Sequence, residues 1–261
     1  MGQGSLRVWR PKYIIRDMNV LLEINLNYSQ AEFTIGLMTG TPEESFSKLP
    51  VYFHNLKKHN PGTLAYIQTN LEDRFEYCFF AIGYATRAFR RFCKKVTIMD
   101  GAYLKGKYKG TILHVVAMDG YNQILPIGYG ICPKETTDSW AWFLEKLHEC
   151  IGDLEGLTLV TDKAASIAIS IQNVFPNAQH GLCGFHLIGN IVHTFGKNKK
   201  TKILLWKLGR LCTLRPDVAA YLSQIPRDKW TRSHCPTMRY NYLTSNSAES
   251  MNVVSKYHTP R

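Results

Sequence analysis

The stretch "KVTIMD" at residues 95–100 is a run of apolar and β-branched residues that ends on a carboxylate, Asp100. Two similar runs follow closely, "TILHVVAMDG" at residues 111–120 and "QILPIGYGIC" at residues 123–132. Runs of this length, separated by links that contain Gly or Asn, predict three β-strands. Because a parallel crossover needs roughly a dozen residues or more, the short links predict an antiparallel meander.

The hydrophobic period changes after this meander. In "TTDSWAWFLEKLHECI", residues 136–151, apolar side chains recur at the three- and four-residue spacing of an amphipathic helix. A short strand ending on Asp162, a second helix, a further strand within "FPNAQHGLCGFH" (residues 175–186) and a basic helical stretch follow. This order predicts an α/β fold with a mixed five-stranded sheet flanked by helices. Right-handed crossovers place the later strands parallel to the first strand and beside it.

The length of 261 residues suits one large domain or two smaller ones. We expect a mainly helical N-terminal region at residues 1–74 and the α/β domain at residues 75–261. Within this domain, a helical and basic insertion at about residues 190–240 should precede the last helix, which Ser245 or Ser247 can cap.

The formal net charge of +12 is distributed unevenly along the chain. Residues 1–95 carry 13 basic and 8 acidic side chains, a net charge of +5. Residues 96–180 carry 6 and 9, a net charge of −3, and residues 181–261 carry 13 and 3, a net charge of +10. Basic flanks around an acidic centre favour a polyanion that is brought to a carboxylate site.

Composition disfavours two classes of protein and one kind of site. No apolar run reaches the roughly 18–20 residues that cross a bilayer, so we expect no membrane partner. Seven cysteines without a C-x-x-C pair favour a reducing compartment over a disulfide framework. Cys183 and His186 form a C-x2-H unit, but no second pair stands at a suitable spacing for zinc. We expect packing or hydrogen bonding near the site from this unit, rather than zinc binding.

The predicted topology brings two carboxylates together. Asp100 and Asp162 end strands that should lie side by side and in parallel, so both should stand at one edge of the sheet. Neighbouring carboxylates repel each other unless a cation lies between them, and hard oxygen ligands suit Mg²⁺ or Mn²⁺. A two-metal site can support an in-line phosphoryl displacement. Glu249, just inside the predicted last helix, is the candidate third carboxylate.

Each carboxylate also has an ordinary structural explanation. Asp-Gly is a common turn pair, as expected for Asp119 and Gly120, and Asp100 precedes a glycine as well. An aspartate between a strand and a helix, such as Asp162, often serves only as an N-cap. A glutamate in a first helical turn, such as Glu249, often only complements the helix dipole. These alternatives stay open for each residue taken singly.

Three stretches together resemble the transposase domain of Mutator-like elements (MULE), especially the plant ones: "IMDGAYLKGKYKGTILHVVAMDG", "LVTDKAASIAISIQNVF" and "RYNYLTSNSAESMN". The resemblance extends from about residue 75 to residue 256. It implies a ribonuclease-H-like fold and a DDE catalytic triad that falls on Asp100, Asp162 and Glu249, with two Mg²⁺ or Mn²⁺ ions. The family's C-x2-H element falls on Cys183 and His186.

The resemblance further implies a DNA substrate, the terminal inverted repeats of a transposon, with a homo-oligomer assembled on it in the nucleus. Basic residues near the motifs are candidate contacts to the DNA backbone: Lys105, Lys107, Lys109, Lys163 and Arg239. The helical insertion is shorter than is usual in the family, and the chain ends soon after Glu249, which suggests a truncated element. A domesticated DNA-binding or transcriptional regulator without cleavage activity, and a remnant without function, are the alternatives.

Overall fold

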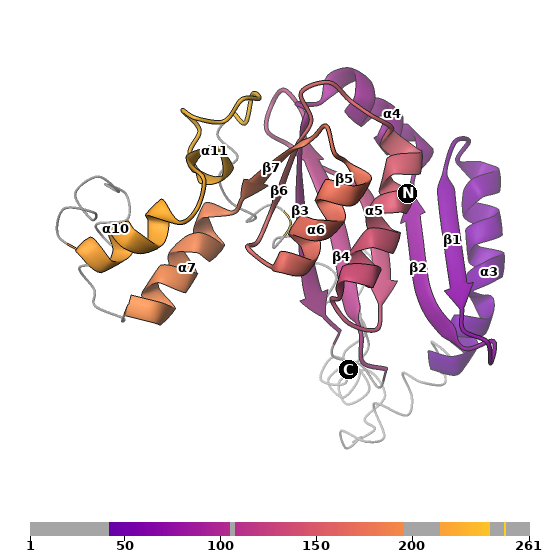
Figure 1. Ribbon diagram of the computed structural model, residues 1–261. Helices are drawn as coiled ribbons and strands as arrows, with labels where there is room; N and C mark the ends of the chain where they lie inside the picture. Colours follow the sequence, from indigo (N-terminus) through magenta and orange to yellow (C-terminus); the bar gives the residue numbers. More distant parts are fainter. Residues whose placement is uncertain (1–41, 105–107, 196–214, 241–247, 249–261) are drawn as a thin grey trace, which may run out of the picture.

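The computed structural model describes residues 42–104, 108–195 and 215–240, together with Ala248. In these residues a mixed sheet of seven strands runs in the order β1-β2-β5-β4-β3-β6-β7, with helices on both faces (Figure 1). The strands are β1 (Leu64–Thr69), β2 (Phe75–Ala81), β3 (Val96–Tyr103), β4 (Thr111–Met118), β5 (Ile124–Cys132), β6 (Thr158–Thr161) and β7 (Gln179–Leu182). The helices are α3 (Pro42–His59), α4 (Gly83–Phe92), α5 (Thr137–Ile151), α6 (Ala165–Val174), α7 (Gly184–Phe195), α10 (Pro216–Ser223) and α11 (Arg227–Trp230).

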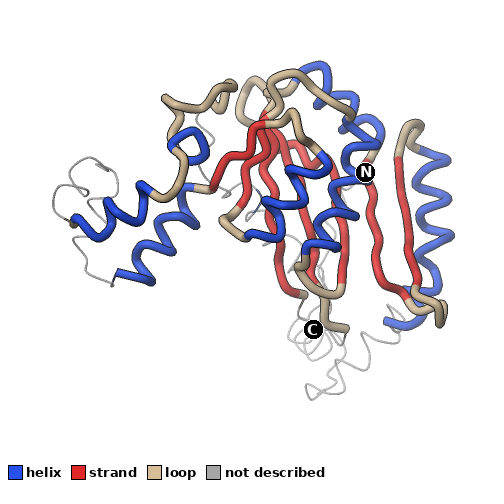
Figure 2. Tube along the Cα trace, viewed as in Figure 1, coloured by secondary structure: helices blue, strands red, loops and turns tan. Residues whose placement is uncertain are grey.

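Strand pairing confirms the predicted meander and the predicted parallel strands. β4 pairs antiparallel with both β3 and β5. β6 pairs in parallel with β3, and β7 pairs in parallel with β6. The chain reaches these two short strands through α5 and α6, which lie along one face of the sheet (Figure 2). The fold is therefore α/β, as the order of strands and helices predicted.

The sheet has two strands more than the five that were predicted. β1 and β2 form an antiparallel hairpin, and β2 extends the sheet by pairing with β5. This hairpin spans residues 74 and 75, where the boundary of the N-terminal region was expected, so the chain on both sides of that point joins one sheet. Apolar and polar residues do not alternate in the β2 sequence "FEYCFFA", in which Cys78, Phe79 and Ala81 are all buried. The hydrophobic pattern of this stretch is therefore only a weak indication of a strand.

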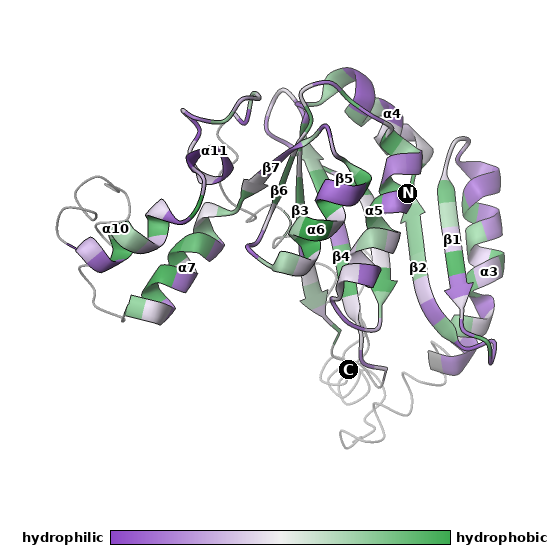
Figure 3. Cartoon of the chain, in the orientation of Figure 1, coloured by the Kyte–Doolittle hydropathy of each residue, from purple (hydrophilic) through white to green (hydrophobic). Residues whose placement is uncertain are grey.

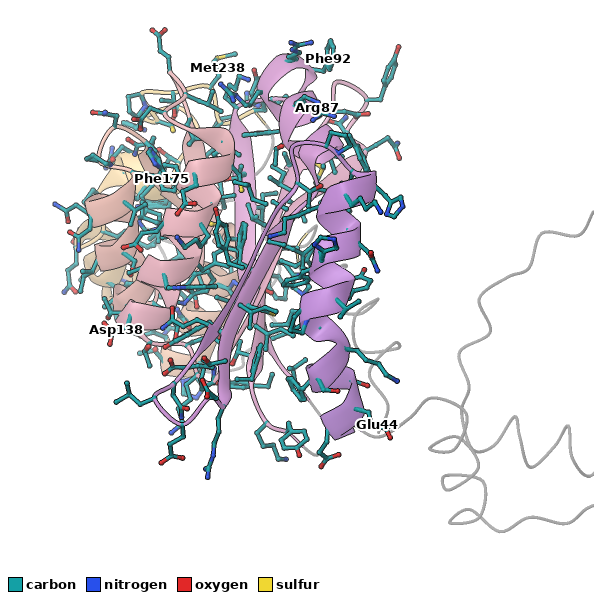
Figure 4. All side chains as sticks on the ribbon, turned by 90° about the vertical axis from the view of Figure 1, so that its right-hand side faces the viewer. Glu44, Arg87, Phe92, Asp138, Phe175 and Met238 are labelled. Carbon is teal, nitrogen blue, oxygen red and sulfur yellow. The ribbon has the colours of Figure 1, made fainter. Side chains whose placement is uncertain are left out.

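The main core lies between the sheet and the helices α5 and α6. α5 begins after Thr136, whose side-chain oxygen accepts a hydrogen bond from the Ser139 backbone N–H at 3.2 Å, so Thr136 is the N-cap. The predicted apolar stripe of this helix is buried: Trp140, Phe143, Leu144, Leu147 and Ile151. Figure 3 shows the hydrophobic strands at the centre, and Figure 4 shows Asp138 and Phe175 on one side of the sheet and Glu44 of α3 on the other.

The helices α7, α10 and α11 extend beyond the β7 edge of the sheet (Figure 1). They share a small core of their own, in which Leu187 and Ile191 of α7 pack with Val218 and Leu222 of α10. Leu182, the last residue of β7, belongs to the same core and joins it to the sheet. In the part of the chain that the structure describes, no helix is long and apolar enough to cross a membrane.

Gly130 in β5 allows the close approach of α5, so Gly130→Ala should destabilise the protein. A Cβ atom at this position would stand 2.6 Å from Cδ2 of Phe143, whose side chain is 1% exposed and has no room to move. We expect a loss of about 1–3 kcal/mol in the free energy of unfolding, measured by urea denaturation. Gly120→Ala is the matched control, because nothing lies within 4 Å of its Cβ position. An equal loss in both variants would contradict the packing explanation.

Candidate functional site

Asp100 and Asp162 lie at the same level of the sheet on neighbouring parallel segments. In the pairing of β3 with β6, Ile98 stands opposite Val160. Asp100 and Asp162 each follow these partners by two residues, and both are half-buried. Because parallel strands advance together, the two carboxylates stand beside each other where β6 ends.

Asp100 does not lie in a turn. β3 continues past it to Tyr103, and Asp100 pairs across the sheet with His114 of β4. The prediction that the strand ends on Asp100 is therefore wrong, and so is the turn alternative for this residue. Asp119 does form the expected turn, because its Oδ1 atom accepts hydrogen bonds from the backbone N–H groups of Tyr121 and Gln123, both at 2.8 Å.

Asp162 shapes the loop between β6 and α6. Its Oδ1 atom accepts a hydrogen bond from the Ala164 backbone N–H at 3.0 Å, which closes a tight turn just past the end of β6. The N-cap position of α6 is occupied by Ala164, which has no side-chain cap, so the N-cap alternative for Asp162 is wrong. The hydrogen bond fixes the carboxylate in a half-buried position at the edge of the sheet.

Glu135 is a third acidic side chain of this region, and the sequence did not point to it. It lies between β5 and α5, directly before the N-cap Thr136. Its carboxylate packs over Gly101, where a Cβ atom would stand 2.7 Å from the carboxyl carbon. Burial, and then the negative charges of Asp162 and Asp100, raise the pKa of Glu135 above its ordinary value. Only the packing of α5 on the sheet reveals this neighbour, since no local motif marks it.

Glu135→Gln should stabilise the metal-free protein at neutral pH. A raised pKa means that the contribution of Glu135 to stability is fully present below its ordinary pKa of 4.5 and is lost as the pH rises through its folded-state pKa. The Tm of the variant should exceed that of the wild type at pH 8, and the difference should close at pH 4. Glu145→Gln, an exposed position on α5, is the control. Equal Tm values of Glu135→Gln and the wild type at pH 8 would contradict this electrostatic picture.

The third member of the predicted triad, Glu249, lies outside the described residues. Its sequence neighbour Ala248 is fully buried in a cluster with Ile98 and Val160, the residues that precede the two aspartates. Among the described residues, no group of three His, Cys, Asp or Glu side chains is arranged to hold a metal ion. The aspartate pair is therefore the part of the predicted triad whose placement is known.

The C-x2-H unit begins helix α7. The sulfur of Cys183 accepts a hydrogen bond from the His186 backbone N–H at 3.5 Å, and the Cys183 carbonyl accepts one from the Leu187 N–H at 2.9 Å. This is the pattern of a helix N-cap, with sulfur in the place of the usual oxygen. Cys183 itself is buried in the cluster that contains Ile98 and Val160.

The candidate DNA-contacting cations have different environments. Lys109 and Lys163 are exposed, whereas Lys105 and Lys107 lie outside the described residues. Arg239 is 1% exposed and donates hydrogen bonds from Nη1 to the Lys229 carbonyl at 2.7 Å and from Nη2 to the Leu182 carbonyl. Burial lowers the pKa of this guanidinium. The prediction that Arg239 contacts a DNA backbone is wrong, because its side chain ties the end of β7 to α11.

Residues 96–190 match the model described as the MULE transposase domain, a stretch that runs from the start of β3 into α7. It contains both aspartates and the C-x2-H unit. Residues 96–190 are thus similar to the MULE transposase domain. The family resemblance stated from the sequence is thereby confirmed for this stretch.

Three curated proteins similar to this chain come from Arabidopsis thaliana. Protein FAR-RED IMPAIRED RESPONSE 1 is 21% identical over 144 residues, 55% of this chain and 17% of that protein. Protein FAR1-RELATED SEQUENCE 5 is 23% identical over 137 residues, 52% of this chain and 17% of that protein. Protein FAR1-RELATED SEQUENCE 6 is 22% identical over 145 residues, 56% and 20% of the two chains. The matched part of the chain thus spans at most a fifth of these relatives.

Proposed function

We propose that residues 96–190 form a MULE transposase domain and act as the catalytic core of a DNA transposase, which cuts and joins DNA strands at transposon ends with the help of a divalent metal. The observation that carries this proposal is the position of Asp100 and Asp162, level with each other on β3 and just past β6. A pair of carboxylates at the same level of two neighbouring parallel segments is a suitable binding place for the metal ions that phosphoryl transfer uses.

The residues of this region fit Mg²⁺ or Mn²⁺. Mg²⁺ commonly takes one or two protein carboxylates, keeps several water molecules and binds substrate phosphates, so Asp100 and Asp162 suit it, with Glu249 as the proposed third ligand. Glu135 supports the fit, because burial first and then the negative charges of Asp162 and Asp100 raise its pKa, and a cation would offset these charges. A bound metal would polarise a phosphodiester oxygen and activate a water molecule or a 3′-hydroxyl group for attack.

The protein's own contribution in this proposal is to fix the two carboxylates before the metal and the DNA arrive. The ladder between β3 and β4 holds the backbone of Asp100 in an extended conformation. The hydrogen bond from the Ala164 N–H holds the carboxylate of Asp162. Groups that are already in place need no reorganisation during the reaction, which is the main source of electrostatic catalysis.

DNA is the proposed partner, at the terminal inverted repeats of a transposon, and the nucleus is the proposed compartment. The net charge of +12, with +10 on residues 181–261, supports attraction to a phosphate backbone. We further propose that a homo-oligomer assembles on the DNA, because strand transfer must bring two transposon ends together.

A DNA-binding regulator that has lost cleavage is the second candidate function. One observation favours it: the names of two similar Arabidopsis proteins, FAR-RED IMPAIRED RESPONSE 1 and FAR1-RELATED SEQUENCE 5, do not refer to transposition. Such a protein would keep the net positive charge and the fold, and its aspartates would serve the structure alone.

A strand-cleavage assay distinguishes the two functions. The full chain is incubated with terminal-inverted-repeat DNA, with Mg²⁺, with Mn²⁺ or with a chelator, and nicked and joined products are resolved on a denaturing gel. Products that depend on the metal support the transposase. DNA binding without metal-dependent products overturns the transposase and supports the regulator.

A further inference from the structure

A groove of about 400 Å³ opens beside Asp162, on the side of β7 and α7. Its lining includes Asp162 and Lys163 from the loop after β6, His186, Asn190 and His193 from α7, and Tyr221 from α10. We call it the β6–α7 groove. Its volume lies within the roughly 300–1,000 Å³ of pockets that hold small organic groups, so it has room for part of a polymer strand.

The groove follows from the way the chain leaves the sheet. β6 and β7 are parallel, and their last residues, Thr161 and Leu182, pair with each other. The chain therefore leaves both strands at the same end of the sheet. One exit is the Asp162 loop, and the other is α7. Open α/β sheets bind ligands outside the carboxyl ends of their strands, and the groove lies at this end of β6. The apolar core shared by α7 and α10 holds the outer wall in place.

The side chains of the groove combine a cation with an aromatic ring and hydrogen-bonding groups. Lys163 places its Nζ atom 3.1 Å from the Tyr221 hydroxyl and 4.5 Å from the centre of that ring. His186, Asn190 and His193 are spaced four and three residues apart, so they lie along one face of α7. Among the lining residues that the structure describes, Asp162 alone is acidic.

This combination matches a nucleotide. An ammonium group neutralises a phosphate, an aromatic ring stacks on a base of any kind, and imidazole and amide groups form hydrogen bonds to base edges or sugars. Proteins that bind single strands join a cationic track to such stacking side chains.

We propose that the β6–α7 groove holds a nucleotide of the DNA strand next to the phosphate that Asp162 faces, an inference that rests on the proposed transposase function. Lys163 contacts the backbone phosphate, Tyr221 stacks on the base, and His193 and Asn190 line the path of the strand along α7. The groove thereby positions a single DNA strand at the carboxylate pair, and the strand enters from the β7 edge of the sheet.

The test measures binding of the full chain to a fluorescent single-stranded DNA oligonucleotide by anisotropy, without metal and at several salt concentrations. Lys163→Gln should weaken binding and reduce the slope of log K against log salt by about 0.7, the value for one phosphate of a single strand. Tyr221→Leu should weaken binding about 5- to 150-fold through lost stacking. Asn190→Asp and His193→Asp change exposed residues, so they test the groove by charge repulsion without a risk to folding.

The chain offers a matched control at the opposite edge of the sheet. There Lys146 lies over the ring of Tyr66 in β1, with its Nζ atom 4.7 Å from the ring centre. Lys146→Gln and Tyr66→Leu should bind the oligonucleotide like the wild type. If the wild type binds and the groove variants bind as well as these controls, the groove inference is overturned and the proposed function stands. An RNA oligonucleotide of the same sequence that binds more tightly than the DNA also overturns the assignment of the groove to a DNA strand. If the wild type binds no DNA, both the groove inference and the proposed function are overturned.

Discussion

Asp100→Asn and Asp162→Asn should each lower metal-dependent DNA cleavage by at least about 10²-fold, the scale of losing one preorganised charge-stabilising group. Asparagine keeps the shape of aspartate but replaces an anionic oxygen by an amide, which is a poor ligand for a hard cation. In Asp162→Asn the side-chain oxygen can still accept the hydrogen bond from Ala164. The initial rate of strand cleavage measures the effect, and the Kd for the same DNA should change by less than about threefold.

The sequence itself supplies the control for this experiment. The tripeptide "MDG" occurs twice, at residues 99–101 and at residues 118–120. Asp119 holds its turn through hydrogen bonds to the N–H groups of Tyr121 and Gln123, which an asparagine oxygen can also accept. Asp119→Asn should therefore cleave like the wild type. A similar loss of cleavage in the Asp119 and Asp100 variants would contradict a specific role for Asp100.

Arg239→Ala should lower the free energy of unfolding by about 2–4 kcal/mol, because it leaves buried carbonyl groups without a donor. This guanidinium donates hydrogen bonds to the Leu182 and Lys229 carbonyls, and the guanidinium carbon would stand 3.0 Å from a Cβ atom at Gly181. The substitution therefore removes both a polar connection and a large buried volume between β7 and α11. Urea denaturation of the metal-free protein measures the loss.

Arg227→Ala is the control for Arg239, since Arg227 is an exposed arginine at the start of α11. It removes the same charge and should change the free energy of unfolding by less than about 0.5 kcal/mol. The structural role of Arg239 would be contradicted if Arg239→Ala left the free energy of unfolding unchanged and reduced the salt dependence of DNA binding. That pair of results would restore the hypothesis that Arg239 contacts a phosphate.

The strands β3 to β6 were predictable because each is a short run of mostly apolar residues, buried on both faces in β4 and β6, and helix α5 because its apolar residues recur at helical spacing. The two "MDG" stretches show where such local information ends. Asp100 and Asp119 have the same neighbours in sequence, yet one lies inside a paired strand and the other in a turn. Asp100 is held in a strand because β3 pairs with β4 and β6, which lie outside the short stretch of sequence around Asp100. The two aspartates could be told apart only from the order of all the strands and helices.

The residues that were missed or misassigned lie where distant segments meet. Glu135 reaches Gly101 because α5 packs across the sheet, and Arg239 reaches Leu182 because α11 lies against β7. A charged residue in sequence gives no sign of whether packing will bury it, so Arg239 looked like a surface cation. The β6–α7 groove was likewise invisible, since its walls come from three separate parts of the chain.

The hairpin of β1 and β2 bears on how the protein can be shortened for study. The MULE match begins at residue 96, but Phe79 of β2 and Phe89 of α4 are fully buried in the same core as Phe143 of α5. A version that starts at residue 96 would lose both rings and uncover the edge of β5, which invites strand pairing between copies and aggregation. The smallest soluble fragment should therefore begin before β1, so the unit that folds is larger than the unit that sequence similarity detects.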